Sequence, residues 1–137
     1  MSRSELIPYA TLLLRIALGT LFLAHGLNKL FVLKPAGVVA FFQSLGLPAF
    51  LAYLTIAAEF GGGLLLLGGI ATSMVSIALV PLMIGTIVMD HGHRGWMFAN
   101  PGGGWEFPAF WSVTLVVQAL LGSGPYSLGS ALGIPVP

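Results

Sequence analysis

The sequence contains no cysteine and very few charged residues. The absence of cysteine excludes disulfide bonds, thiolate metal sites and any dithiol relay. Only 7% of the residues are charged, whereas a soluble domain has roughly 25%. The net charge of +1 provides neither a basic patch for nucleic acid nor an acidic tail. Because 57% of the residues are hydrophobic, a soluble fold of this size could not bury them, and we expect the chain to lie in a lipid bilayer.

Four apolar segments predict membrane-spanning helices. A helix needs about 20 residues to cross a hydrocarbon core roughly 30 Å thick. The segments that fit cover residues 7–30, 49–67, 73–89 and 107–121. The first segment is too long for the apolar part of a signal peptide and carries Arg15, so we interpret it as a span. An even number of spans predicts that both termini lie on one side of the membrane.

The connections between the predicted spans differ in length and polarity. Residues 67–73 suit a tight hairpin, and residues 90–106 form the polar connection. Residues 31–47 have apolar side chains spaced for a short helix in the membrane interface. We find no linker or internal repeat, and we expect one transmembrane domain over residues 1–137. The predicted fold is an all-α membrane protein, a four-transmembrane-helix bundle with a short interfacial helix in loop one.

Two ionisable residues lie inside predicted spans, where a charge is costly and indicates a functional role. Arg15 is about 12 Å from the start of the first span and Glu59 about 15 Å from the start of the second. Because these spans are antiparallel, both residues are expected at similar depth, and an Arg15–Glu59 ion pair is the simplest way to bury them. Such a pair either fixes only the packing of the helices or takes part in chemistry, and both alternatives stay open.

A second polar group is predicted at one end of the bundle, because loops one and three lie on the same side. His25 and Lys29 are four residues apart and share one face of the first span. The third connection contributes Asp90, His91, His93, Trp105 and Glu106. Each residue has an ordinary structural explanation, such as a lysine reaching the interface or a tryptophan of the aromatic belt. Their convergence nevertheless indicates a ligand site.

The chemistry of this group favours a quinone, whose oxygens need polar partners and whose tail needs apolar walls. An imidazole such as that of His25 transfers protons or hydrogen-bonds a carbonyl oxygen. We expect catalytic roles for His25, Lys29, Glu59 and Glu106, and ligand contacts from Arg15, His91 and Trp105. Zinc at Asp90, His91 and His93 is a weaker alternative because Gly92 favours a flexible turn. Haem is weaker still, since His25 and His91 would have to face each other as axial ligands. We therefore expect no metal site.

Several of these residues form an ordered set that resembles the DoxX family. Arg15-Ile-Ala-Leu-Gly19 precedes His25-Gly26 and Lys29, and Glu59 precedes a run of glycine and leucine. Trp105-Glu106 ends the polar loop, and the tail contains Gly122-Ser-Gly-Pro-Tyr-Ser127. The resemblance covers residues 11–128. This chain has Gly129 where the tail of the family often has an aspartate.

The resemblance implies a four-helix inner-membrane protein of bacteria. Relatives include a membrane subunit of a thiosulfate:quinone oxidoreductase, and others are linked to oxidative stress or to quinone and catechol response. The family's polar positions fall on Arg15, His25, Lys29, Glu59 and Glu106. We therefore expect a quinone-associated redox component with a redox partner protein. The alternatives are a non-enzymatic anchor or scaffold for such a partner and a small-molecule or proton carrier, and the many glycines would also favour a homo-oligomer.

Overall fold

The computed structural model describes residues 2–134, which form helices and connecting turns without a β-strand. Three helical segments are long and apolar enough to cross a membrane, namely Arg3–Val32, Ala49–Gly68 and Thr72–Arg94. A fourth segment, Glu106–Leu121, is apolar but shorter. The predicted all-α membrane bundle is confirmed.

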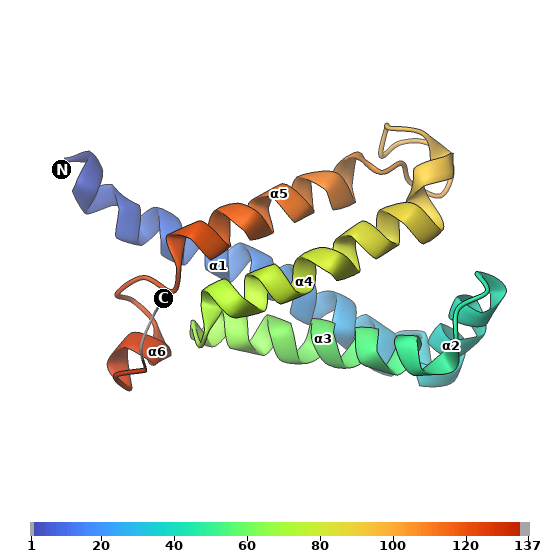
Figure 1. Ribbon diagram of the computed structural model, residues 1–137, viewed down its shortest axis with the longest axis horizontal. Coiled ribbons are helices and arrows are strands. Elements are labelled where there is room, and N and C mark those ends of the chain that lie inside the picture. The colour runs from blue at the N-terminus through green and yellow to red at the C-terminus, as the bar shows by residue number, and fades with distance from the viewer. Residues whose placement is uncertain (1, 135–137) are drawn as a thin grey trace.

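The helices follow the order predicted from the apolar segments (Figure 1). They are α1 (Arg3–Leu27), α2 (Lys34–Ser44), α3 (Ala49–Gly68), α4 (Thr72–Thr86), α5 (Glu106–Leu121) and α6 (Leu128–Ala131). The short helix expected in loop one is α2. Two of the long helices end in π-helical turns: α1 continues into Asn28–Val32 and α4 into Ile87–His91, which a 3-10 turn at Gly92–Arg94 follows.

Local sequence explains where two of these helices begin and end. The Ser2 hydroxyl accepts a hydrogen bond from Glu5 N at 3.4 Å, and Ser2 N donates to Glu5 Oε2 at 2.6 Å. This reciprocal capping box starts α1. At the end of α3, Gly69 has a φ of 68°, a left-handed conformation that glycine adopts without strain. The chain therefore reverses into α4 within a short turn.

Glycines lie where α1 packs on α3, which is the most extensive helix contact of the bundle. A Cβ atom at Gly26 would lie 2.7 Å from Phe60 N, and one at Gly63 would lie 2.6 Å from Leu23 N. Neither position has room for a larger side chain, and small residues commonly allow such close approach of membrane helices. The same contacts fix the antiparallel register of the two helices.

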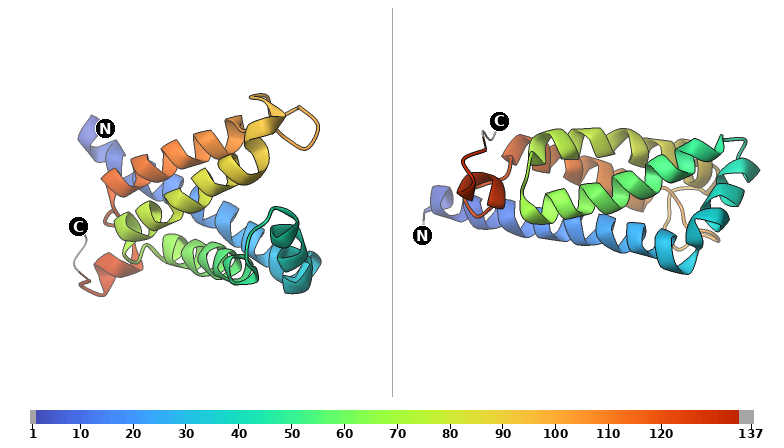
Figure 2. Two further views of the ribbon diagram at one scale, coloured as in Figure 1. Left: turned by 45° about the vertical axis from the view of Figure 1, so that its right-hand side comes forward. Right: turned by 90° about the horizontal axis from the view of Figure 1, so that it is seen from below.

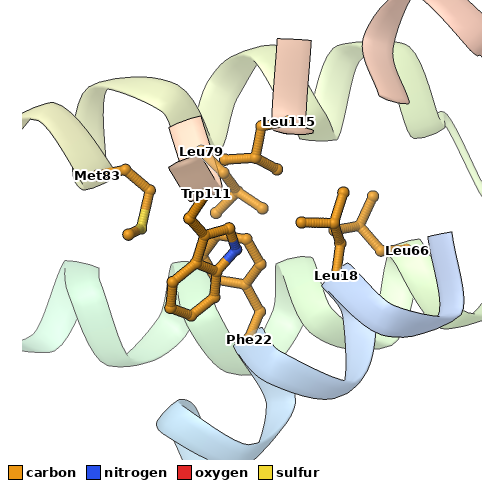
Figure 3. Packing of buried hydrophobic residues seen from close by; sticks show 7 residues of the cluster. All are labelled: Leu18, Phe22, Leu66, Leu79, Met83, Trp111 and Leu115. Carbon is orange, nitrogen blue, oxygen red and sulfur yellow. The ribbon is translucent and has the colours of Figure 1, made fainter. Parts of the chain in front are cut away.

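The main apolar core lies between four helices, α1, α3, α4 and α5, which are called the four long helices below (Figure 3). Its buried side chains are Leu18, Phe22, Leu66, Leu79, Met83, Trp111 and Leu115. The rings of Phe22 and Trp111 have centroids 4.7 Å apart, within the range of favourable aromatic pairs. This core joins α1 and α3 to α4 and α5.

The four long helices form two pairs that diverge toward one end of the molecule. α1 packs mainly with α3, and α4 packs mainly with α5. α3 and α4 meet at their hairpin and separate toward the end where α2 lies (Figures 1 and 2). α2 packs on α3 through a small cluster of Val38, Ala52 and Ile56. The start of α1 and the short helix α6 are both at the opposite end, on different sides of the bundle (Figure 1).

Candidate functional site

A cavity of about 1040 Å³ lies at the diverging end of the bundle. All five helices from α1 to α5 contribute to its walls, which are mostly apolar. Its polar and charged lining residues are His25, Lys29, Thr55, Glu59, Thr86, Asp90 and His91. Apolar walls with a few convergent polar groups are the usual form of a small-molecule site.

Lys29 and Glu59 form an ion pair on the cavity wall. Lys29 Nζ donates to both carboxylate oxygens, at 2.9 Å to Oε1 and 2.7 Å to Oε2. The side chain of Glu59 is 7% exposed and that of Lys29 is 19% exposed. Lys29 belongs to the π-helical turn after α1, and such turns within helices are often found at functional sites. An ammonium group has three N–H donors, so one remains for a ligand.

The predicted Arg15–Glu59 ion pair is wrong, because Arg15 bonds backbone carbonyl oxygens and Glu59 pairs with Lys29. The Arg15 side chain is buried and donates to three carbonyl oxygens, at 3.0 Å to Leu66, 2.9 Å to Leu67 and 2.5 Å to Tyr126. The last carbonyls of a helix lack intrahelical partners and favour a nearby cation. Arg15 therefore ties α1 to the end of α3 and to the tail, and it does not line the cavity.

The register of α1 and α3 explains this error. The prediction treated the ends of the first two apolar segments as level. In the structure, α1 and its π turn extend to Val32, and Gly26 lies beside Phe60. Lys29, almost one turn beyond Gly26, is consequently the residue that reaches Glu59.

His25 lines the cavity and has one ring nitrogen without a hydrogen-bond partner among residues 2–134. Its Nδ1 lies 2.8 Å from the carbonyl oxygen of Leu21. Because a carbonyl oxygen only accepts, Nδ1 carries the proton and Nε2 of the neutral ring is an acceptor. The ring also meets Trp111 edge-on, with centroids 5.0 Å apart. Both contacts fix the orientation of the imidazole.

His91 reaches the same cavity from the other helix pair. Its Nδ1 lies 2.8 Å from the carbonyl oxygen of Gly103, and its Nε2 lies 3.5 Å from Asp90 Oδ2. Asp90 also pairs with Arg94, which donates to the carbonyl oxygen of Gly102. These bonds hold the polar loop against the end of α4. Within residues 2–134, no group of three or more histidine or carboxylate side chains is placed to hold a metal ion.

Glu106 and Trp105 lie outside the cavity, contrary to the prediction. Glu106 is the first residue of α5, and its Oε1 accepts a hydrogen bond from Phe98 N at 2.8 Å. Trp105 packs edge-on against Trp96, with centroids 4.5 Å apart. Both side chains thus order the loop that precedes α5, and the carboxylates that line the cavity are those of Glu59 and Asp90.

Trp111 is a wall residue that the sequence analysis did not single out. Its ring contacts those of Phe22, His25 and Phe107. A sequence signal was present, because Trp111 lies within an apolar segment, whereas belt tryptophans lie near the ends of spans. A tryptophan at such a position favours contact with another helix or with a ligand.

The tail motif makes structural contacts away from the cavity. Ser123 Oγ donates to Thr72 Oγ1 at 2.9 Å, and Ser127 Oγ accepts from Ser130 N at 3.1 Å, which starts α6. A Cβ atom at Gly129 would lie 2.6 Å from the carbonyl oxygen of Gly69. This chain therefore has no room for the aspartate that the resemblance would place there.

Comparisons with known proteins found similar sequences. The model of the DoxX family matches residues 10–92, a segment that contains every histidine and charged residue lining the cavity. A protein of Bacillus subtilis (strain 168), described as "Putative oxidoreductase CatD", is 37% identical over 113 residues. That match covers 82% of this chain and 79% of the relative. No solved structure matches the chain.

Proposed function

Because the chain belongs to the DoxX family, we propose that it is a membrane-embedded redox component that binds a quinone in the cavity. The Lys29–Glu59 ion pair within an otherwise apolar cavity is the observation that carries this proposal. In this proposal the protein lies in the plasma membrane of a bacterium and exchanges electrons with a partner oxidoreductase. His25, Lys29, Glu59 and His91 form its site.

The shape and lining of the cavity suit a quinone better than a small polar metabolite. Its volume of about 1040 Å³ is slightly above the roughly 300–1,000 Å³ that small-molecule sites usually have. The apolar walls match a quinone ring and tail, whereas a fully polar ligand would leave most of its hydrogen-bonding groups without partners. The polar side chains therefore mark where the head group binds.

Lys29 is suited to hold a quinone carbonyl oxygen. Two of its N–H groups are directed to Glu59, which fixes the position of the ammonium group. The third N–H donates to the ligand, and a hydrogen bond from a charged group contributes about 1.5–3 kcal/mol. Glu59 thus acts through Lys29 and is a positioning residue.

His25 is suited to move the proton that accompanies quinone chemistry. Its Nδ1–H is bound to the carbonyl oxygen of Leu21, which leaves Nε2 to accept a proton from a quinol hydroxyl. In the reverse direction the protonated ring returns that proton to a quinone oxygen. Imidazole groups exchange protons near neutral pH and fit this task.

The electrons in this proposal are carried by the quinone and by a partner protein. The chain has no cysteine, so thiols cannot carry them. The description of the Bacillus relative as an oxidoreductase supports a redox role. In this arrangement the chain binds and orients the quinone, while the partner supplies or accepts the electrons.

Quinone binding to the purified protein in lipid nanodiscs tests the proposal. Because Trp111 lines the cavity, a short-tailed quinone should quench its fluorescence on binding. Lys29→Met and His25→Ala should each weaken binding about tenfold, the effect of losing one good hydrogen bond. His93→Ala is the matched control, because His93 does not line the cavity.

Two results would count against this function. The proposal fails if the wild-type protein binds no quinone, or if His25→Ala and His93→Ala bind it equally well. A role as a membrane anchor for a redox partner would then be the better assignment.

A further inference from the structure

The cavity reaches the outer surface of the bundle between α3 and α4. On α4, Ile77 and Ile84 are exposed and do not line the cavity. These two residues therefore mark the row of α4 side chains that faces the lipid. Pro81 lies four residues after Ile77 and three before Ile84 and therefore shares that row. It is exposed and also lines the cavity. Pro81 is thus a rim residue, common to the cavity and the lipid-facing surface.

The same pattern occurs on the facing side of α3. Phe50 is exposed and does not line the cavity, whereas Leu54, one turn further on, is 58% exposed and does line it. The two helices close again near their hairpin, where a Cβ atom at Gly62 would lie 3.0 Å from Leu79 Cδ1. The opening therefore has Leu54 on one rim, Pro81 on the other and the Gly62–Leu79 contact at its inner end.

This opening lies at the depth of the hydrocarbon core. Pro81 is about 14 Å along the helix from Thr72, at the helical rise of about 1.5 Å per residue. It lies well inside the apolar segment Thr72–Arg94. Beyond the rim, a Cβ atom at Gly85 or Gly37 would meet no other atom within 4 Å, and both glycines line the cavity. The cavity therefore has open space beside Gly85 of α4 and beside Gly37 of α2.

We infer that the ligand is a membrane-dissolved amphiphile that enters sideways between α3 and α4 and leaves its long apolar tail between Leu54 and Pro81. The identity of its head group as a quinone rests on the proposed function, whereas the opening itself does not. A ligand taken from the bilayer keeps its tail in an apolar environment throughout entry, so only the head group exchanges its surroundings. Lys29 and Glu59 then meet that head group inside the cavity.

A bulky side chain on the rim tests this route. Ala78 lines the cavity one turn before Pro81 and is exposed, so Ala78→Phe narrows the opening without filling the core. Ile77→Phe is the matched control, since the neighbouring Ile77 is exposed to lipid but does not line the cavity. In nanodiscs, Ala78→Phe should slow the association of a long-tailed isoprenoid quinone about tenfold. Ala78→Phe should change the association rate of tail-less duroquinone much less. The control Ile77→Phe should change neither association rate.

A second measurement needs no quinone. In a Trp96→Phe/Trp105→Phe background, Trp111 is the remaining tryptophan and lines the cavity. Lipids with brominated acyl chains should quench its fluorescence through the opening, and Ala78→Phe should reduce this quenching while Ile77→Phe should not.

The outcomes separate this inference from the proposed function. The sideways route is wrong if Ala78→Phe and Ile77→Phe give equal quenching by brominated lipids. It is also wrong if Ala78→Phe associates with the long-tailed quinone as fast as the wild-type protein does. If the protein binds no quinone but quenching still depends on residue 78, the proposed function fails and the opening stands as a lipid entrance.

Discussion

Lys29→Met and Glu59→Gln, made singly and together, measure how strongly these two side chains are coupled in the bundle. Removing one partner of a buried ion pair leaves an unpaired charge and costs roughly 3–5 kcal/mol. The side chain of Glu59 is 7% exposed and that of Lys29 is 19% exposed, so both are close to the buried case. We expect Lys29→Met to cost more, because it leaves the more deeply buried charge unpaired.

The double variant removes both charges and should lose clearly less stability than the sum of the two single variants. For two groups in direct contact, the coupling free energy is of the order of 0.5–3 kcal/mol. Arg15→Met combined with Glu59→Gln provides the control, because Arg15 bonds carbonyl oxygens at the other end of α3. Those two losses should add to within about 0.5 kcal/mol.

Reversible unfolding in mixed micelles with increasing SDS, followed by circular dichroism, gives these free energies without any ligand. Strong coupling between Arg15 and Glu59, with none between Lys29 and Glu59, would refute the assignment of the ion pair. It would also mean that α1 and α3 have a different register from the one that the glycine contacts define.

Three further variants test the packing of the helices and the tail. Gly63→Val should destabilise the bundle by about 1–3 kcal/mol, because its Cβ would lie 2.6 Å from Leu23 N. Gly61→Val is its control, since a Cβ there would meet nothing within 4 Å, and equal unfolding midpoints for both would contradict the α1–α3 contact. Ser127→Ala removes the cap of α6 and should cost about 1 kcal/mol, with faster hydrogen exchange at Ser130; unchanged exchange would show that the cap is unimportant. Gly129→Asp should lower the melting temperature through its clash with Gly69, and an unchanged value would mean that the tail can move away.

The sequence was sufficient to predict the helices, because long apolar segments and their turns are local features. It also brought His25, Lys29 and His91 to one end, since chain topology alone determines which helix ends share a side. These three residues do line one cavity. The helix ends could not be predicted, because both α1 and α4 continue into π turns that no apolar pattern marks.

The partners of buried charges could not be predicted in the same way. Depth counted from the edge of an apolar segment places Arg15 beside Glu59, but the actual register depends on which glycines meet across α1 and α3. Backbone carbonyls at a helix end were also overlooked as partners for Arg15. Glu106 was assigned to the cavity from its position in the chain, whereas the direction of the first turn of α5 turns it toward the loop.

Photolabelling with an azido-quinone, followed by peptide mapping, tests the central claim most directly. We predict that in nanodiscs the label attaches to two peptides, one with Lys29 in the turn after α1 and one with Glu59 in α3, and that excess unlabelled quinone prevents this labelling. Lys29→Met should greatly reduce this labelling. Labelling that excess quinone does not prevent, or labelling confined to the outer surface of α5 around Phe110, would contradict a quinone site in the cavity.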